Sequence, residues 1–179
     1  MTGRYLRGLG DTNILIFLER LPVAQLPSEL VISTVSLAEL SAGVHSAADA
    51  VERARRIMRV QRAEATFSPL PFDVEAARQY GIIAAEVISR GRKPRGRVAD
   101  LMIASIAAAN RLPLFTTNPA DFNGLESVVT VVPVSVPLLG SSCDLRCPAP
   151  RVPGRRAARR HRHAPLRDRA RSGRPGQQR

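Results

Sequence analysis

The chain has 179 residues, which suits one domain of ordinary size and is short for two. Apolar residues make up 44% of it, but Trp is absent and aromatic residues reach only 4%, so Ala, Val, Leu and Ile have to build the core. The net charge of +12 is unevenly spread: residues 1–140 hold 15 basic and 13 acidic side chains, whereas residues 141–179 hold 12 Arg and 2 Asp. The overall charge therefore describes the C-terminal segment and not the part that folds.

No apolar stretch reaches the roughly 20 residues that a membrane-spanning helix needs. The longest candidate, residues 128–139, is broken by two prolines, and Asp11 interrupts the only early apolar stretch, so we expect neither a membrane segment nor a cleavable signal. Both cysteines, Cys143 and Cys147, lie in the C-terminal segment, and the body needs no disulfide. These features favour a cytoplasmic protein.

Short apolar runs alternate with helical patterns along the body of the chain. Residues 1–10 are expected to be irregular, because Arg and Gly interrupt their apolar side chains. Helices are predicted over residues 12–20, 35–43, 47–64, 73–90 and 98–110, and strand-like runs over 30–34, 66–72, 112–117 and 128–132. The strands are continuous apolar runs, which is typical of a parallel sheet covered by helices on both faces, the α/β class.

Within the helix over residues 73–90, the periodicity favours five apolar side chains as core positions: Val74, Ala77, Ile82, Ala85 and Ile88. The helix over residues 98–110 is apolar on almost every side and should be buried. We expect one folded domain over residues 11–139. Residues 140–179 are rich in Arg, Pro and Gly, cannot bury enough apolar surface to offset the cost of ordering, and are expected to form a disordered tail.

Four acidic residues lie against apolar segments: Asp11, Glu39, Asp100 and Asp121. Glu39 and Asp121 follow predicted strands, and Asp11 follows the interrupted apolar run of residues 1–10, which takes the place of a first strand. Asp100 lies in the first turn of the buried helix over residues 98–110. The carboxyl ends of parallel strands meet at one edge of a sheet, where ligands bind. The four side chains are therefore expected to converge on one crevice.

Each acid also has a purely structural explanation. Asp11 can cap the helix that follows it, and Glu39 can close a capping box with Ser36. Asp121 can stabilise a turn after a proline. A salt bridge to a nearby arginine can account for Asp100, because a lone carboxylate on an apolar helix is strongly disfavoured.

Taken together, four carboxylates in one crevice repel one another and raise one another's pKa values, and a divalent cation removes that conflict. Carboxylate ligands favour Mg²⁺ or Mn²⁺ over Zn²⁺, and His45 is the only histidine in the body. Carboxylate-bound Mg²⁺ is the usual apparatus of phosphodiester chemistry.

Four short motifs carry a family resemblance: DTNILI (11–16), SLAEL (36–40), ADLMIA (99–104) and TTNPADF (116–122). In order and spacing they resemble the motifs of PIN-domain ribonucleases, in particular the VapC-type toxins of bacterial toxin–antitoxin pairs. The resemblance covers residues 11–137. It implies a three-layer PIN-like fold, in which a short parallel sheet lies between helices.

The resemblance also implies an activity, a metal and partners. The four acids would hold one or two Mg²⁺ or Mn²⁺ ions in an endoribonuclease that hydrolyses RNA phosphodiester bonds. Asn13 and Thr117 would orient ligands or waters, and Asn118 would lie near the metal. Members of this family are usually homodimers that a cognate antitoxin blocks.

A basic loop directly precedes Asp100, and we expect it to meet RNA phosphates through Arg92, Lys93, Arg95 and Arg97. Two alternatives stay open. One is a nucleic-acid-binding protein without catalysis, driven by its basic tail. The other is a phosphatase-like domain with Asp11 as nucleophile, although a haloacid-dehalogenase motif has a second Asp where this chain has Asn13.

Overall fold

The computed structural model describes residues 5–137, and the expectations for the tail over residues 140–179 lie outside them. Four short strands form one sheet in the order β2-β1-β3-β4, and every neighbouring pair is parallel. The strands are β1 (Arg7–Gly10), β2 (Glu29–Val31), β3 (Leu114–Thr116) and β4 (Val131–Pro133). The parallel sheet expected from the sequence is thus confirmed.

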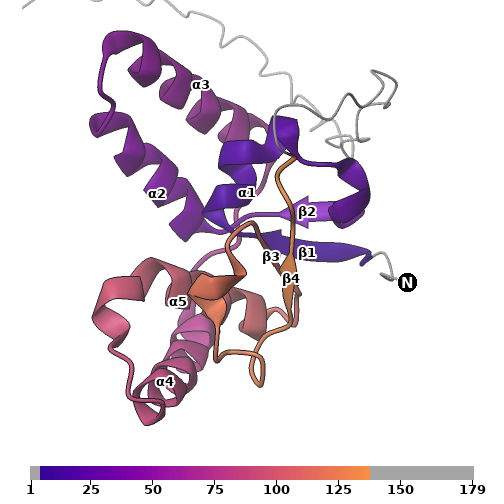
Figure 1. Cartoon of the computed structure of the whole chain (residues 1–179), viewed down its shortest axis with the longest axis vertical. Helices are drawn as coiled ribbons and strands as arrows, with labels where there is room; N and C mark the ends of the chain where they lie inside the picture. Colours follow the sequence, from indigo (N-terminus) through magenta and orange to yellow (C-terminus); the bar gives the residue numbers. More distant parts are fainter. Residues whose placement is uncertain (1–4, 138–179) are drawn as a thin grey trace, which may run out of the picture.

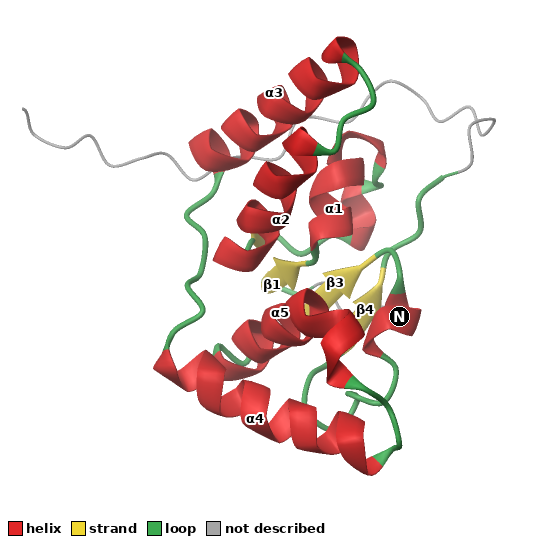
Figure 2. Cartoon of the chain, turned by 90° about the vertical axis from the view of Figure 1, so that its left-hand side faces the viewer, coloured by secondary structure: helices red, strands yellow, loops and turns green. Residues whose placement is uncertain are grey.

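Helices cover both faces of the sheet, with α1, α2 and α3 on one side and α4 and α5 on the other (Figure 2). Their bounds are Thr12–Phe17 for α1, Thr34–His45 for α2, Ala50–Thr66 for α3, Val74–Ser89 for α4 and Val98–Ala109 for α5. Four 3₁₀ turns complete the fold: η1 (Leu18–Arg20), η2 (Val23–Gln25), η3 (Pro94–Arg97) and η4 (Pro119–Phe122). Three of the longer helices begin at side-chain caps, provided by Ser33, Asp49 and Asp73.

The largest part of the core lies between the sheet and α5. In this helix six residues from Leu101 to Ala107 are buried, and they pack with Leu9 and Leu114 of the two central strands. Ala, Leu and Ile dominate this layer, which is the composition that the scarcity of aromatic residues requires. A smaller cluster around Ile14 and Phe115 fills the space on the α1 side.

The N-terminal segment differs from the prediction of irregular structure. Residues 7–10 form β1, which pairs with β2 on one side and β3 on the other, so it lies in the centre of the sheet. Gly8 does not interrupt this strand but is required by its packing. A Cβ at this position would lie 2.7 Å from Cδ2 of Phe115, whose ring is buried against the strand.

The α2–α3 hairpin projects from one side of the molecule and is closed at its base (Figure 1). Ser33, just before α2, forms a parallel bridge with Leu70, after α3. The Leu70 N–H donates to the Ile32 carbonyl over 2.8 Å, and the Thr34 N–H donates to the Leu70 carbonyl over 2.9 Å. The chain therefore leaves the sheet and returns to it at the same point.

The buried side of α4 also differs from the prediction. The residues that face the core are Ala76, Ile83 and Val87, whereas all five residues favoured by the periodicity are exposed. Small and aliphatic residues occur on both sides of this helix, so the sequence pattern alone gave the wrong face. Within residues 5–137, we find no helix whose length and apolar character would let it cross a membrane.

The packing at Gly8 generates a stability prediction. We expect Gly8→Ala to lower the free energy of unfolding by about 1–3 kcal/mol, because the added methyl group has to displace the buried Phe115 ring. Urea denaturation measures the change. Gly43→Ala in α2 is a matched control, since the nearest atom to its added Cβ is 3.9 Å away, and alanine there should stabilise the helix by about 0.5–1 kcal/mol. Equal stability of Gly8→Ala and the unaltered chain would contradict this account of β1.

Candidate active site

The four acids identified in the sequence gather at the carboxyl edge of the sheet. Asp11 directly follows β1, and Asp121 lies in η4, after β3. Glu39 comes from α2 and Asp100 from the first turn of α5. The charges of the other three acids all raise the pKa of Asp100, so the four carboxylates act on one another as a cluster.

Asp11 is the most deeply placed of the four, with only 3% of its surface exposed. Its Oδ1 accepts a hydrogen bond from the Thr12 N–H over 2.7 Å, which is the helix-capping role expected of it. Its Oδ2 accepts one from the Thr116 hydroxyl over 3.0 Å, and the Asn13 amide lies 3.5 Å from the same oxygen. Burial raises the pKa of this carboxyl, and the two shorter hydrogen bonds oppose the shift.

Glu39 is joined to the Asp11 region by a side-chain contact. The Thr12 hydroxyl donates to Oε2 of Glu39 over 2.5 Å. The capping-box explanation for this glutamate is wrong, because the N-cap of α2 is Ser33, whose hydroxyl accepts from the Ser36 N–H. Glu39 therefore lies in the second turn of the helix, and its carboxylate does not cap the helix but lies near Asp11 and Asp100.

Asp100 has the clearest electrostatic signature in the cluster. Desolvation and the neighbouring acids raise the pKa of Asp100 to about 6, and the nearby Arg97 opposes the shift without reversing it. Among residues 5–137 no ion pair within 4.0 Å joins this carboxylate to an arginine. The salt bridge considered as an explanation for Asp100 is therefore not formed.

Asp121 and the supporting polar residues lie together after β3. The Asn118 amide donates to Oδ2 of Asp121 over 2.6 Å, so Asn118 adjoins the acids as expected. The supporting threonine expected from the sequence is Thr117, but the hydroxyl that holds Asp11 belongs to its neighbour Thr116. Thr116 is the last residue of β3 and fully buried, and the same hydroxyl oxygen accepts from the Asn118 N–H over 3.0 Å. The signal in the sequence that points to Thr116 is the run of three polar residues, TTN (116–118), at the end of an apolar strand.

The donor set fits a hard, hydrated cation. The four carboxylates lie at one edge of the sheet, and burial, together with the charges of the neighbouring acids, raises the pKa values of Asp11 and Asp100. In the described part of the chain, however, no three acidic, His or Cys side chains stand close enough to hold an ion directly. Mg²⁺ typically uses one or two carboxylates and keeps several waters, so an all-protein cage is not required.

The basic loop before Asp100 is only partly available for ligands. Arg92 donates to the Asn123 carbonyl over 3.0 Å, and Nη2 of Arg97 is buried, with no hydrogen-bond partner among the described residues. Lys93 and Arg95 are exposed. The structure thus brings Arg97 near the acids, whereas Lys93 and Arg95 are exposed at the start of η3 and within it.

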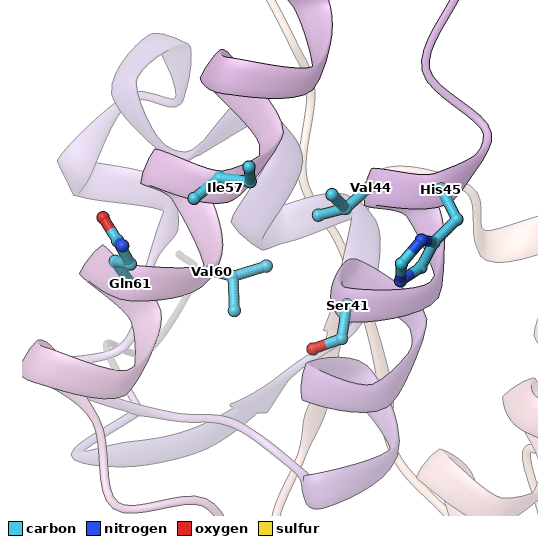
Figure 3. A pocket seen from close by; sticks show the side chains of 6 residues that line it. All are labelled: Ser41, Val44, His45, Ile57, Val60 and Gln61. Carbon is cyan, nitrogen blue, oxygen red and sulfur yellow. The ribbon is translucent and has the colours of Figure 1, made fainter.

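Two hollows lie along the α2–α3 hairpin. The first, of about 180 Å³, is lined by Ser41, Val44, His45, Ile57, Val60 and Gln61 and contains none of the four acids (Figure 3). The second, of about 250 Å³, adjoins the acid cluster, because Thr12 and Glu39 line it together with Arg56 and Arg59. Arg56 donates hydrogen bonds to the Glu52 carboxylate and to the Gly43 carbonyl, which hold its guanidinium in place.

Comparison with known proteins identifies the family of this chain. The profile of the PIN domain family matches residues 9–126. The chain belongs to the PIN-domain family. Ribonuclease VapC5 of Mycobacterium tuberculosis is 35% identical over 127 residues, which span 69% of this chain and 91% of that protein. Ribonuclease VapC of Rickettsia bellii is 30% identical over 131 residues, or 69% and 95% of the two chains.

Among solved structures, VapBC-5 of M. tuberculosis, a member of the VapBC family of toxin–antitoxin systems, matches with a TM-score of 0.63 and 33% identity. The match covers 73% of this chain and 99% of that chain. The predicted PIN fold and the resemblance to VapC-type ribonucleases are therefore confirmed. The four motifs that carried the resemblance lie at the sheet edge and the helices around it.

The raised pKa of Asp100 has a consequence for stability. Between its ordinary pKa of 3.8 and about 6, the folded chain holds a proton that the unfolded chain has lost, so this stabilisation is complete below pH 3.8 and disappears as the pH rises through 6. We expect the difference in melting temperature between the unaltered protein and Asp100→Asn, both in EDTA, to change with pH. From about pH 5 to about pH 7 the unaltered protein should lose stability relative to the variant.

Addition of Mg²⁺ at about pH 7 should reverse that difference, because the cation compensates the charge that Asp100 gains. Differential scanning fluorimetry provides the comparison. Parallel pH profiles for the two proteins would contradict the raised pKa.

Proposed function

We propose that this chain is an endoribonuclease toxin that hydrolyses RNA phosphodiester bonds with Mg²⁺ or Mn²⁺ held by Asp11, Glu39, Asp100 and Asp121. The observation that carries the proposal is the mutual electrostatic effect of these carboxylates at one edge of the sheet. Four acids without a matching set of cations are unfavourable for folding, so their presence together favours a role in metal binding.

The four acids have different roles because they differ in burial and in their hydrogen bonds. Asp11 is held on both oxygens, which fixes its orientation, and Asn13 lies beside it. Asp100 and Asp121 lie at the more open side, where they can turn toward an ion, and Asn118 restrains Asp121. A bound divalent cation would lower the pKa of a coordinated water and neutralise charge on the phosphodiester. The hydrogen bonds of Thr12 and Thr116 keep the ligands in place for that chemistry.

RNA is proposed to reach the acids past the basic loop at η3. Lys93 and Arg95 are exposed there and can contact phosphates, while Arg97, one turn before Asp100, lowers the repulsion on an incoming phosphate. Arg92 and Arg97 also shape the loop, since the first is bound to Asn123 and the second is partly buried. In this proposal Lys93 and Arg95 contact the RNA, whereas Arg92 and Arg97 hold the shape of the loop.

We further propose that an antitoxin protein binds this chain and that the chain forms a homodimer. The similarity to VapBC-5, described as a toxin–antitoxin system, supports the first statement. Exposed apolar residues on α3 among several arginines provide a surface suited to an acidic partner. Because the proposed substrate is RNA, we propose that the protein acts in the cytoplasm.

The two alternative functions receive less support. Asp11 is a poor candidate for a phosphatase nucleophile, because both of its oxygens accept hydrogen bonds and only 3% of its surface is exposed. A binding protein driven by its basic tail gives no reason for four acids to share one edge of the sheet. The tail itself lies outside the described residues.

Asp100→Asn tests the proposed chemistry. We expect metal-dependent RNA cleavage to fall roughly 10–100-fold or more, because the variant loses a ligand charge in the cluster. The fold should persist, since the amide relieves repulsion among the acids. Cleavage of total cellular RNA is measured with Mg²⁺, with Mn²⁺ and with EDTA, and circular dichroism checks the fold.

Glu64→Gln is a matched control, because Glu64 is exposed on α3 and outside the cluster. It should retain full activity. Undiminished, metal-dependent cleavage by Asp100→Asn would exclude the four-acid site, and salt-sensitive RNA binding without any cleavage by the unaltered chain would favour the binding protein.

Replacement of Lys93 and Arg95 by Gln tests the path of the RNA. We expect weaker binding to every RNA sequence and a slope of log affinity against log salt that is smaller by roughly 0.7 for each phosphate that the variant no longer neutralises. Binding is measured in EDTA, so that cleavage does not interfere. Arg111→Gln is the control, because Arg111 is exposed at the opposite edge of the sheet, before β3. An equal change in slope for both would show that the loop has no special role.

A further inference from the structure

The larger of the two hollows opens beside the acid cluster, and the chemistry proposed above does not use it. It has a volume of about 250 Å³, and its lining residues come from α1, α2 and α3, which lie together in Figure 1. Thr12 and Glu39, which are hydrogen-bonded to each other within the acid cluster, both line it. A substrate held at the acids therefore has this hollow as an immediate neighbour.

Part of the lining is apolar. Ile16 of α1, which is 38% exposed, and the Leu40 side chain of α2 both contribute to it. The volume is slightly below the roughly 300–1,000 Å³ of sites for drug-sized ligands, so the hollow suits one small ring system and not a whole cofactor. A nucleobase is a flat group of this kind, with an apolar face and polar edges.

Gly43 keeps this space open. Glycine inside a helix is destabilising relative to alanine, yet Gly43 lies within α2 and lines the hollow. The nearest atom to a Cβ at this position would be Nη1 of Arg56, 3.9 Å away, so no contact within the protein requires a glycine here. Because Arg56 also lines the hollow, a larger side chain at position 43 would narrow it. A ligand that needs the space accounts for the glycine.

The α3 side of the hollow is positively charged. Arg56 is already held by the Glu52 carboxylate and the Gly43 carbonyl. Arg59, nearly one helical turn further along α3, lines the hollow too, and among residues 5–137 no acidic side chain lies within 4.0 Å of its guanidinium. A guanidinium group binds phosphate oxygens in a bidentate manner. The hollow therefore offers an anion contact beside an apolar wall.

We propose that this hollow binds one unpaired nucleotide of the RNA, adjacent to the phosphate that is cleaved. The base lies against Ile16 and Gly43, and a phosphate of the same nucleotide contacts Arg59. The proposal rests on the proposed ribonuclease function and adds a subsite to it. Proteins that read RNA commonly take up unstacked bases from single strands and loops, so the expected substrate is single-stranded around the cleavage site.

The subsite lies on the other side of the acids from the basic loop. Lys93 and Arg95 precede α5, whereas Arg59 belongs to α3, and these two helices cover opposite faces of the sheet (Figure 2). An RNA strand that contacts both regions therefore passes over the carboxyl edge of the sheet, where the acids lie. Continuity with the acids and a size that suits a single base favour RNA over a segment of a partner protein as the occupant.

Gly43→Leu tests the space directly. The new side chain should fill part of the hollow, and affinity for a short single-stranded RNA, measured in EDTA, should fall roughly 10-fold because the base contact is lost. Ala42→Leu is the matched control, since Ala42 is the neighbouring residue of α2, is exposed and lines neither hollow. It should bind RNA as the unaltered chain does. Circular dichroism checks that both variants fold.

Arg59→Gln tests the phosphate contact without filling the hollow. We expect KM for RNA cleavage to rise roughly 10-fold with kcat little changed, because a charge-assisted contact to the bound substrate is removed away from the reacting atoms. The slope of log affinity against log salt should decrease by roughly 0.7. Arg53→Gln makes the same charge change at an exposed position of α3 that does not line the hollow, and it should leave both quantities unaltered.

Removal of single bases identifies the nucleotide. In an RNA whose cleavage site has been mapped, abasic substitution at one position beside the scissile phosphate should weaken binding to the unaltered chain roughly 10-fold. The same substitution should have little further effect on binding to Gly43→Leu, because that variant no longer receives the base. Such non-additivity is the signature of two changes that remove one interaction.

The outcomes separate this subsite from the proposed function. An unaltered chain that neither binds nor cleaves RNA would overturn both. A chain that cleaves RNA with metal, but whose Gly43→Leu and Arg59→Gln variants behave like their controls, would overturn the subsite and leave the nuclease intact. Loss of antitoxin binding by the two variants, with RNA binding unchanged, would also overturn it and would assign the hollow to the antitoxin.

Discussion

The carboxylate of Asp11, almost wholly withdrawn from water, is the constraint on which the site depends. It lies where β1 passes into α1, and its hydrogen bonds reach both the first turn of that helix and the end of β3. The two central strands are therefore held in register at the edge where the other acids collect. Because Gly8 lets Phe115 pack against β1, the same strand that looks weakest in the sequence brings this carboxylate into the centre of the molecule.

The position of the acids could be predicted because it follows from topology. In a parallel sheet, residues after successive strands meet at one edge, whatever the side chains between them are. The identity of the threonine that holds Asp11 could not be predicted in this way, because Thr116 and Thr117 are neighbours and only the register of β3 with β1 decides which one faces inward. The central strand was missed for a related reason, since the residue that requires Gly8 is Phe115, more than a hundred residues later in the chain.

The outer faces of α3 and α4 both carry exposed apolar residues, but the two helices differ in charge. On α4 the two glutamates pair with Arg78 and with Arg90, the residue that follows the helix, whereas α3 carries a surplus of arginine. The sequence showed apolar periodicity on both but not which side faced the core. On α4, Ala, Val and Ile occupy the buried and the solvent side alike, so only packing against α5 determines the orientation. The residues that the periodicity placed in the core are thus exposed on the outer side of α4.

The closed base of the α2–α3 hairpin separates the turn at its tip from the sheet. Because Leu70 is hydrogen-bonded to Ile32 and Thr34 where the chain leaves and rejoins the sheet, the turn over residues 46–49 can change in length without altering the strands. Extra residues, a protease site or a fluorescent reporter placed there would leave β1, β3 and Asp11 undisturbed.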